Sequence, residues 1–252
     1  MDVDTAQPLG TPTWIDLGVP DLDRALEFYG AVFGWDFAVG PEEYGRYTTC
    51  LLRGRAAAAI TTEYDVSTGP AWRVFLATPD CDDTVSHVRH AGGEVLVEPD
   101  DIGDQGRLAF ARDPTGAVFG LWQGRAHIGC EVVNEPGSLV RNDLVTPDPQ
   151  RAREFYAHVF GFTLDGNQDM PEADFTFLRR PDGHEIGGIM GAPGGGSAWA
   201  TTFEVAGTDE AVGRALAHGG TSDGASDFLY GRLATVTDPF GAQFSLITRP
   251  TP

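Results

Sequence analysis

Apolar residues recur at the three- and four-residue spacing of a helix within residues 17–34. The apolar face includes Phe28 and Tyr29. Asp21 follows a proline at the start of this stretch and can cap a helix, and Gly34 can end it. We therefore predict a helix over residues 21–33 that packs an aromatic face against a sheet.

The same stretch occurs a second time, at residues 144–161. The two copies, LGVPDLDRALEFYGAVFG and LVTPDPQRAREFYAHVFG, share 11 of 18 positions without a gap. Tyr29 of the first copy corresponds to Tyr156 of the second. A repeat of this length indicates an internal duplication, so we predict two related domains, residues 11–124 and 136–250.

Alternating and apolar runs around these helices predict strands. A second pair of repeats, GRLAFARDPTGAVFGL at residues 106–121 and GRLATVTDPFGAQFSL at 231–246, places a DPxG turn between the last two strands of each half. The order strand, helix and further strands then occurs four times. We predict an α+β fold of four βαβββ modules, arranged as two pairs.

Charge and cysteine content narrow the range of partners. The formal net charge is −20, from 17 Lys+Arg against 37 Asp+Glu, which disfavours nucleic acid as a partner. No apolar run is long enough to span a membrane, and the start of the chain lacks the pattern of a signal peptide. Three cysteines without metal-ligand spacing are interpreted as free thiols, so we expect a cytoplasmic protein.

Four βαβββ modules, the PD…FY…VFG helix and the DPxG turn resemble the vicinal oxygen chelate superfamily. This superfamily includes glyoxalase I, extradiol dioxygenases and bleomycin-resistance proteins. The segments DIGDQGRLAF and RAHIGCEVVNEPGSLV are similar to two-domain actinobacterial members that carry the label hydroxylase or 27 kDa antigen. The resemblance implies two glyoxalase-like domains whose sheets curl into half-barrels around cavities.

Metal-dependent members of the superfamily place His or Gln on the first strand of a module and Glu on its last strand. Carried over to this chain, those positions fall on Trp14 and Ala59, Trp72 and Gly120, Arg141 and Gly188, and Trp199 and Ser245. Tryptophan, arginine, glycine, alanine and serine are poor ligands for a divalent metal. We therefore expect no metal and no other cofactor.

The same positions predict two cavities. Because strand residues alternate between faces, Asp16 shares a face with Trp14, and Asp143 shares a face with Arg141. The family's module pairing then implies one cavity with Trp14, Asp16, Trp199 and Ser245, and another with Trp72, Arg141, Asp143 and Gly120. We expect a neutral planar ligand in the first and an anionic one in the second. The alternative is that the tryptophans simply fill the core.

Several functions remain open at this point. One is metal-independent binding of an aromatic or planar metabolite or antibiotic, as in bleomycin-resistance proteins, with Trp14, Trp72, Gly120, Arg141, Trp199 and Ser245 as ligand contacts. Another is an enzyme of specialised metabolism, a hydroxylase, oxidoreductase or isomerase, with Asp16 or Asp143 as general base. A metal-dependent glyoxalase or dioxygenase fits less well. The expected partner is a small molecule, and the oligomeric state stays open because a monomer can pair its halves internally.

Overall fold

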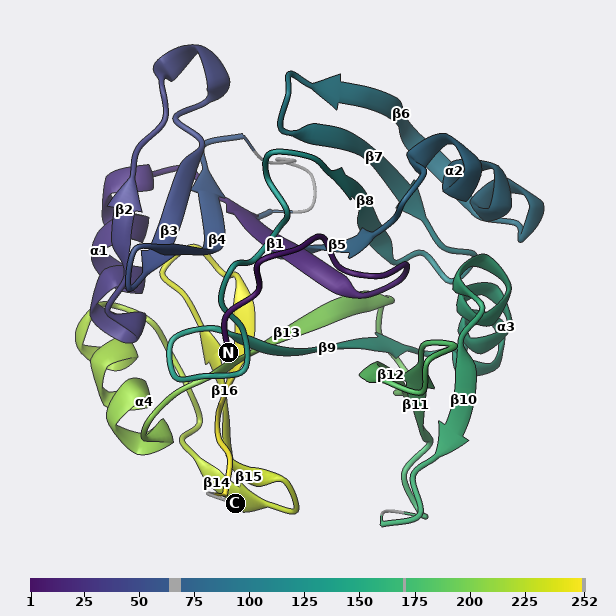
Figure 1. The fold of residues 1–252 in the computed structure, drawn as a ribbon. Coiled ribbons are helices and arrows are strands. Elements are labelled where there is room, and N and C mark those ends of the chain that lie inside the picture. The colour runs from purple at the N-terminus through teal and green to yellow at the C-terminus, as the bar shows by residue number, and fades with distance from the viewer. Residues whose placement is uncertain (64–68, 170, 251–252) are drawn as a thin grey trace.

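The computed structural model describes residues 1–63, 69–169 and 171–250 and contains one eight-stranded sheet in each half of the chain (Figure 1). The first half consists of β1 (Pro12–Gly18), α1 (Leu22–Phe33), β2 (Asp36–Ala38), a 3₁₀ turn (Glu42–Tyr44), β3 (Thr48–Leu52), β4 (Arg55–Thr61), β5 (Trp72–Ala77), α2 (Cys81–His90), β6 (Glu94–Ile102), β7 (Gly106–Arg112) and β8 (Val118–Gly124). The second half consists of β9 (Leu139–Thr146), α3 (Pro149–Phe160), β10 (Thr163–Gly166), β11 (Phe175–Arg179), β12 (Glu185–Gly191), β13 (Ala198–Glu204), α4 (Thr208–Ala217), β14 (Ser226–Phe228), β15 (Gly231–Thr237) and β16 (Gln243–Thr248).

Both sheets have the same topology. Their orders are β2-β3-β4-β1-β5-β8-β7-β6 and β10-β11-β12-β9-β13-β16-β15-β14. The first strands of two consecutive modules, β1 with β5 and β9 with β13, pair antiparallel at the centre. Each central strand also runs parallel to the last strand of its own module. The predicted α+β class and the four βαβββ modules are confirmed.

The two repeated helices begin and end as their sequences predict. The Asp21 carboxylate accepts a hydrogen bond from the Arg24 N–H, and Asp148 does the same for Arg151. Gly34 has a φ of 74° and its N–H bonds back to the carbonyl of Gly30, a left-handed end that favours glycine. Three short edge strands, β2, β10 and β14, were not predicted, because their three or four residues are too few to show alternation.

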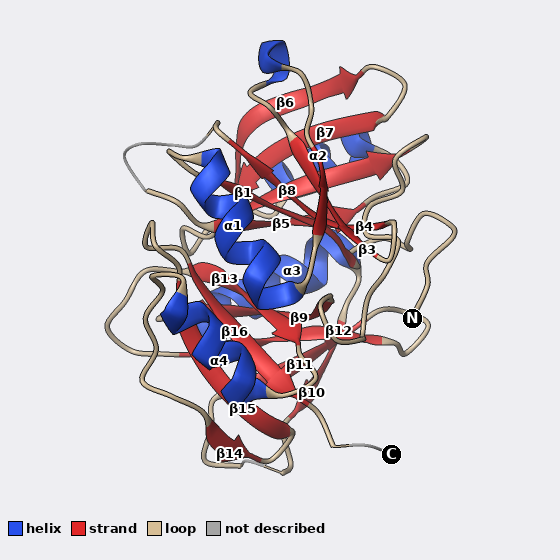
Figure 2. Ribbon diagram, turned by 90° about the vertical axis from the view of Figure 1, so that its left-hand side faces the viewer, coloured by secondary structure: helices blue, strands red, loops and turns tan. Residues whose placement is uncertain are grey.

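The predicted pairing of modules one with four and two with three is wrong for the sheets. Consecutive modules share a sheet, so each half of the chain forms its own curved sheet. The predicted pairing of modules one with four and two with three is found among the helices instead, where α1 packs on α4 and α2 packs on α3. Helices α1 and α3 lie between the two sheets (Figure 2): Phe33 of α1 packs against Phe203 of β13, and Tyr156 of α3 packs against Phe119 of β8. The opposite face of each sheet therefore points away from the other half.

The aromatic face of each repeated helix is core, as its spacing predicts. Tyr29 and Phe28 of α1 and Tyr156 of α3 are fully buried. Within the described ranges, no helix has both the length and the apolar character that crossing a membrane requires.

Candidate functional site

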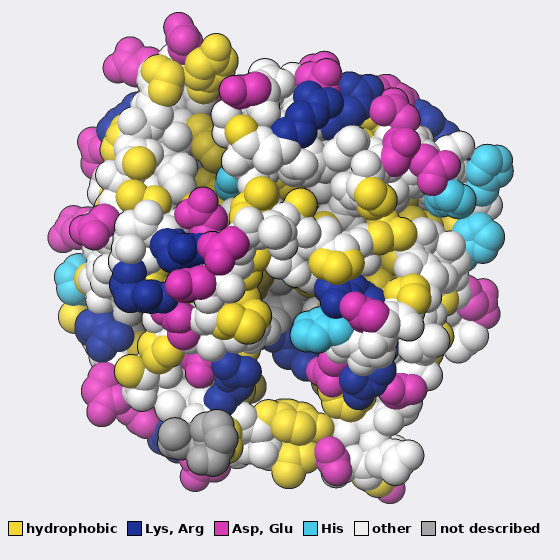
Figure 3. All heavy atoms as spheres, in the orientation of Figure 1, with side chains coloured by type: hydrophobic (Ala, Val, Ile, Leu, Met, Phe, Trp, Pro, Cys, Tyr) yellow, Lys and Arg dark blue, Asp and Glu magenta, His cyan; other side chains and the backbone are white. Residues whose placement is uncertain are grey.

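A cavity of about 830 Å³ occupies the outward face of the second sheet. Its lining comes from strands β9, β11, β12, β13, β15 and β16, and the segment that precedes β1 covers one side. Figure 3 shows this region as a deep opening in the lower half of the molecule, bordered by charged and apolar side chains.

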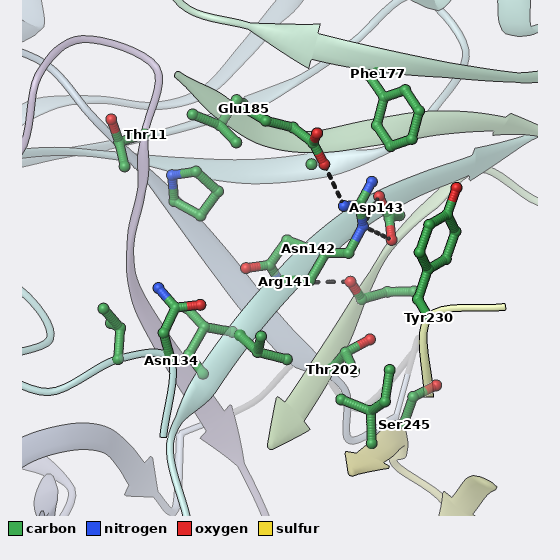
Figure 4. A pocket seen from close by; sticks show the side chains of 18 of the residues that line it. Thr11, Asn134, Arg141, Asn142, Asp143, Phe177, Glu185, Thr202, Tyr230 and Ser245 are labelled. Carbon is green, nitrogen blue, oxygen red and sulfur yellow. Dashed lines mark hydrogen bonds and ion pairs between the residues drawn. The ribbon is translucent and has the colours of Figure 1, made fainter. Parts of the chain in front are cut away.

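Arg141 of β9 is the charged centre of this cavity. Its Nε donates to both carboxylate oxygens of Asp143, at 2.8 and 2.7 Å, and its Nη1 donates to Oε1 of Glu185 at 2.6 Å. The guanidinium carbon also lies 5.4 Å from the ring centroids of Phe175 and Phe177. Figure 4 shows Arg141 between Glu185 and Asp143, with Phe177 beside the pair. Two carboxylates and two rings thus hold one cation.

Burial alters the acid–base properties of this group. Burial raises the pKa of Asp143, and the charge and hydrogen bond of Arg141 lower it by less, so the net pKa lies above the ordinary value. For Arg141, burial lowers the pKa, but Asp143 and Glu185 together raise it by more. Arg141 therefore remains a cation at every physiological pH.

The strands that follow β9 in the sheet contribute apolar side chains and two hydroxyls, and Thr202 pairs directly with Arg141. Leu233 and Ile247 contribute apolar side chains, and Thr202 and Ser245 contribute hydroxyl groups. Thr202 and Ser245 are neighbours in the parallel pair β13–β16, and both appear below Arg141 in Figure 4. Among the described residues, neither hydroxyl makes a side-chain hydrogen bond, so both are available to a ligand.

A tyrosine from the hairpin of β14 and β15 borders the cavity. The Tyr230 hydroxyl approaches Oδ1 of Asn167 at 3.4 Å and Oδ2 of Asp169 at 3.5 Å, on the loop that follows β10. The two ends of the second sheet therefore meet across the cavity.

Of the predicted site residues, Arg141, Asp143 and Ser245 line this one cavity. The prediction assigned Ser245 to a different cavity from the other two. They come together because modules three and four share a sheet.

Trp72 and Trp199 do not line the 830 Å³ cavity and pack against the helices, contrary to prediction. The Trp199 indole N–H donates to the Tyr156 hydroxyl of α3 at 2.9 Å, and Trp72 packs edge-on against Tyr29 of α1. Trp199 pairs with Leu144 in the sheet, a residue on the helix-facing side. Successive residues of a strand lie on opposite faces. The residues of β5 and β13 on the outward face of each sheet are therefore Arg73 and Ala200, one position after Trp72 and Trp199. These two tryptophans are core, as the alternative interpretation held.

Trp14 and Asp16 lie on the outward face of the first sheet, where their environment is packed. Asp16 is buried and accepts a 2.6 Å hydrogen bond from Nε of Arg73. The Trp14 indole donates to the Tyr47 hydroxyl at 2.8 Å and meets the His127 ring edge-on at 4.4 Å. Burial raises the pKa of Asp16, and Arg73 opposes that shift.

Gly120 does not leave a space for a ligand. A Cβ added there would lie 2.1 Å from the Phe75 ring, which fills the volume that a larger side chain would occupy. Phe75 also packs on Phe110 with a centroid distance of 5.3 Å. In the second half, Thr202 and Ser245 stand at the positions that correspond to Phe75 and Gly120, by the offsets of the two repeats. Because Thr202 and Ser245 do not fill this space as Phe75 does, a cavity remains over the outward face of the second sheet.

Glu185, Thr202, Arg73 and Tyr47 were missed by the sequence analysis. The side on which Arg73 and Thr202 lie follows from the register that pairs Trp72 with Leu17 and Trp199 with Leu144, which no local sequence pattern shows. Glu185 and Tyr47 carry no sequence signal either, since both come from turns or strand ends outside the repeats.

The donor set in neither half fits the divalent metal of the metal-dependent relatives. The described residues contain no group of three or more His, Cys, Asp or Glu side chains arranged to hold a metal ion. In the second half, the carried-over positions present the Arg141 guanidinium and the Ser245 hydroxyl, and Arg141 binds the facing carboxylates. A fixed cation at that position repels a second one.

Two curated relatives cover almost the entire chain. "Putative glyoxylase CFP32" of Mycobacterium tuberculosis is 37% identical over 96% of this chain and 96% of its own. "Anthracycline biosynthesis protein DnrV" of Streptomyces peucetius is 34% identical over 94% of this chain and 93% of its own.

Solved structures share the fold at low identity. The Mn(II)-bound glyoxalase from Novosphingobium aromaticivorans superposes with a TM-score of 0.67 at 18% identity, covering 97% of this chain and 85% of that one. The 2,3-dioxygenase LapB from Pseudomonas sp. KL28 has a TM-score of 0.67 at 16% identity, covering 98% and 96%.

The family model described as "Glyoxalase/Bleomycin resistance protein/Dioxygenase superfamily" matches residues 11–121 and again residues 137–246. These two matches coincide with the two sheets. The chain therefore belongs to the glyoxalase/bleomycin resistance protein/dioxygenase superfamily and contains two copies of its domain.

Proposed function

We propose that this protein binds a planar aromatic metabolite in the cavity of its second half, without a metal. The observation that carries the proposal is the difference between the two sheets. The first outward face is packed by Phe75 against Gly120, and the second keeps a cavity of about 830 Å³ over Thr202 and Ser245. That volume lies within the roughly 300–1,000 Å³ of small-molecule sites.

The lining supports an aromatic ligand. Phe175, Phe177 and Tyr230 offer rings, and Leu233 and Ile247 offer an apolar surface opposite them. The relative DnrV is named for anthracycline biosynthesis, which favours a polycyclic aromatic molecule of specialised metabolism.

The experiment fills the second cavity with the packing that the first half already uses. Thr202→Phe combined with Ser245→Gly reproduces the Phe75–Gly120 pair. Equilibrium dialysis against anthraquinone, followed by absorbance, should show at least tenfold weaker binding to the double variant than to the wild type. Thr163→Phe on the exposed edge strand β10 makes the same change outside the cavity and should bind normally. Equal affinity of all three proteins would refute the proposal.

An enzyme that uses Asp143 as general base is the second candidate. It is favoured by a cavity position and by burial, which raises the pKa of this carboxyl group. The hydrogen bonds from Arg141 count against it, because they stabilise the charged carboxylate and make it a weaker base. Mass spectrometry of anthraquinone substrates after incubation with the wild type and Asp143→Asn separates the candidates. Binding without turnover supports the first.

A further inference from the structure

We infer that the second cavity selects aromatic ligands that carry a hydrogen-bond-donating hydroxyl and rejects those that carry a carboxylate. This inference rests on the proposed function and names the ligand class of the same site. It reverses the expectation, drawn from Arg141 alone, that the ligand is anionic.

The arginines of the cavity are already neutralised. Three arginines line it, and each has a carboxylate partner: Arg141 binds Asp143 and Glu185, Arg179 binds Asp165, and Arg249 binds Glu204. Arg179 also lies 3.5 Å from Glu185. These three arginines therefore face four carboxylates, Asp143, Asp165, Glu185 and Glu204, which leaves a formal excess of one negative charge.

Arg141 has no pair of free N–H groups with which to bind an anion. Its Nε points to Asp143 and its Nη1 to Glu185. Its Nη2 is buried and has no hydrogen-bond partner among the described residues. Because this atom is shielded, the guanidinium cannot present the paired N–H groups with which arginine binds carboxylates.

The carboxylates keep acceptor capacity. A carboxylate has about four lone-pair sites. Glu185 receives one hydrogen bond from Arg141 and a weaker contact from Arg179, which leaves sites free. The side chains of Asp143 and Glu185 retain 22% and 31% of their exposure, so a molecule in the cavity can reach them.

The strands next to Arg141 reinforce this selection. The Thr202 and Ser245 hydroxyls on β13 and β16 can each donate or accept, so they satisfy a carbonyl or hydroxyl on a ring system that lies over these strands. A ligand carboxylate would instead lie near the Asp143 and Glu185 carboxylates, beside an arginine whose Nε and Nη1 are already bound to them. Unpaired like charges in a partly buried site are strongly unfavourable.

Two probes with the same rings test the inference. 2-Naphthol is a neutral hydroxyl donor at pH 7, and 2-naphthoate is its carboxylate counterpart. Equilibrium dialysis should show that the wild type binds 2-naphthol at least tenfold more tightly than 2-naphthoate. Asp143→Asn and Glu185→Gln each remove one negative charge beside Arg141, and each should narrow that ratio at least threefold by strengthening naphthoate binding.

Asp209→Asn is the matched control, because Asp209 forms a carboxylate–arginine pair with Arg232 in the same half but outside the cavity lining. It should keep the wild-type ratio. Two carboxylate variants at different positions keep the test decisive if one of them misfolds. Naphthoate binding as tight as naphthol binding in the wild type, or a ratio unchanged in both variants, would overturn the inference.

The two proposals fail in different ways. If the Thr202→Phe/Ser245→Gly variant binds anthraquinone like the wild type, the cavity is not the site and both proposals are wrong. If that variant loses binding but the naphthol preference is absent, the cavity stands as the site and only its selectivity is wrong.

Discussion

The Tyr29 hydroxyl donates a 2.9 Å hydrogen bond to Oδ2 of Asp238, which lies in the other half of the chain. The duplication repeats this contact in reverse, because Tyr156 donates at 3.0 Å to Oδ2 of Asp113. The tyrosine belongs to the repeated helix and the aspartate to the repeated DPxG turn. The two sequence repeats therefore bind each other across the boundary between the domains.

Each aspartate also organises its own turn. Oδ1 of Asp238 accepts the backbone N–H groups of Phe240 and Ala242, and Oδ1 of Asp113 does the same for Thr115 and Ala117. One carboxylate thus fixes a turn with one oxygen and joins the two halves with the other.

Tyr29→Phe should lower the free energy of unfolding by about 1.5–3 kcal/mol, because it leaves a buried carboxylate oxygen without its donor. Urea denaturation followed by circular dichroism measures this change. Tyr44→Phe, which removes a hydroxyl from an exposed side chain, is the control and should change stability little. A loss for Tyr29→Phe no larger than that of the control would contradict a linking role for this bond.

The sequence predicted the modules well because their signals are local. Residues 21–34 carry a cap, an apolar face and a terminating glycine, and all three act within the helix or at its ends. Which modules share a sheet is not a local property, and here it differs from the pairing implied by the resemblance.

The site was only partly predictable, for a related reason. Asp143 was placed by simple alternation from Arg141. The prediction placed Trp199 on the wrong face of the sheet, because the side of β13 that faces the cavity depends on its register with β9. The second carboxylate partner of Arg141, Glu185, comes from another strand, so no spacing in the sequence links the two residues.

Phe75→Ala should destabilise the protein by about 3–5 kcal/mol, because Phe75 is core in the first half and its removal leaves a void against Gly120 and Phe110. Phe228→Ala makes the same change on an exposed ring of the second half and should cost little. Urea denaturation compares the two. Similar losses would show that the first outward face is not packed as described.

The three cysteines should resist thiol reagents in the folded state. Cys50, Cys81 and Cys130 are buried and unpaired, and burial raises the pKa of Cys81 and of Cys130 from 9.0 to about 12. At pH 8, the native protein should react with Ellman's reagent far more slowly than the protein in 8 M urea, where all three react. Rapid labelling of the native protein would contradict their burial.

The same shifts predict how stability depends on pH. A thiol whose pKa is higher in the folded than in the unfolded state contributes its full stabilisation below pH 9, and that stabilisation is lost as the pH rises toward 12. The urea midpoint should therefore fall between pH 9 and pH 11. Cys130→Ala should flatten this fall, and an identical slope in wild type and variant would contradict the assignment.

Gly120 and Gly188 offer a final comparison, because each has its Cβ position occupied by a phenyl ring. An added Cβ would lie 2.1 Å from the Phe75 ring at Gly120 and 2.1 Å from the Phe175 ring at Gly188. Neither glycine has a positive φ, so alanine creates a steric conflict without backbone strain. The outcome depends on whether each ring can move.

Phe75 is buried against Phe110, so its ring cannot move away from an added methyl group. Gly120→Ala should therefore lower the free energy of unfolding by about 1–3 kcal/mol. Phe175 is only partly buried and borders the open cavity, so it can turn into that space. Gly188→Ala should therefore cost less stability but weaken anthraquinone binding, because the displaced ring enters the site. Gly166→Ala, with open space around its Cβ position, is the control for both measurements. If Gly188→Ala proves as destabilising as Gly120→Ala and leaves binding intact, the Phe175 ring is fixed, and the cavity wall is more rigid than its exposure indicates.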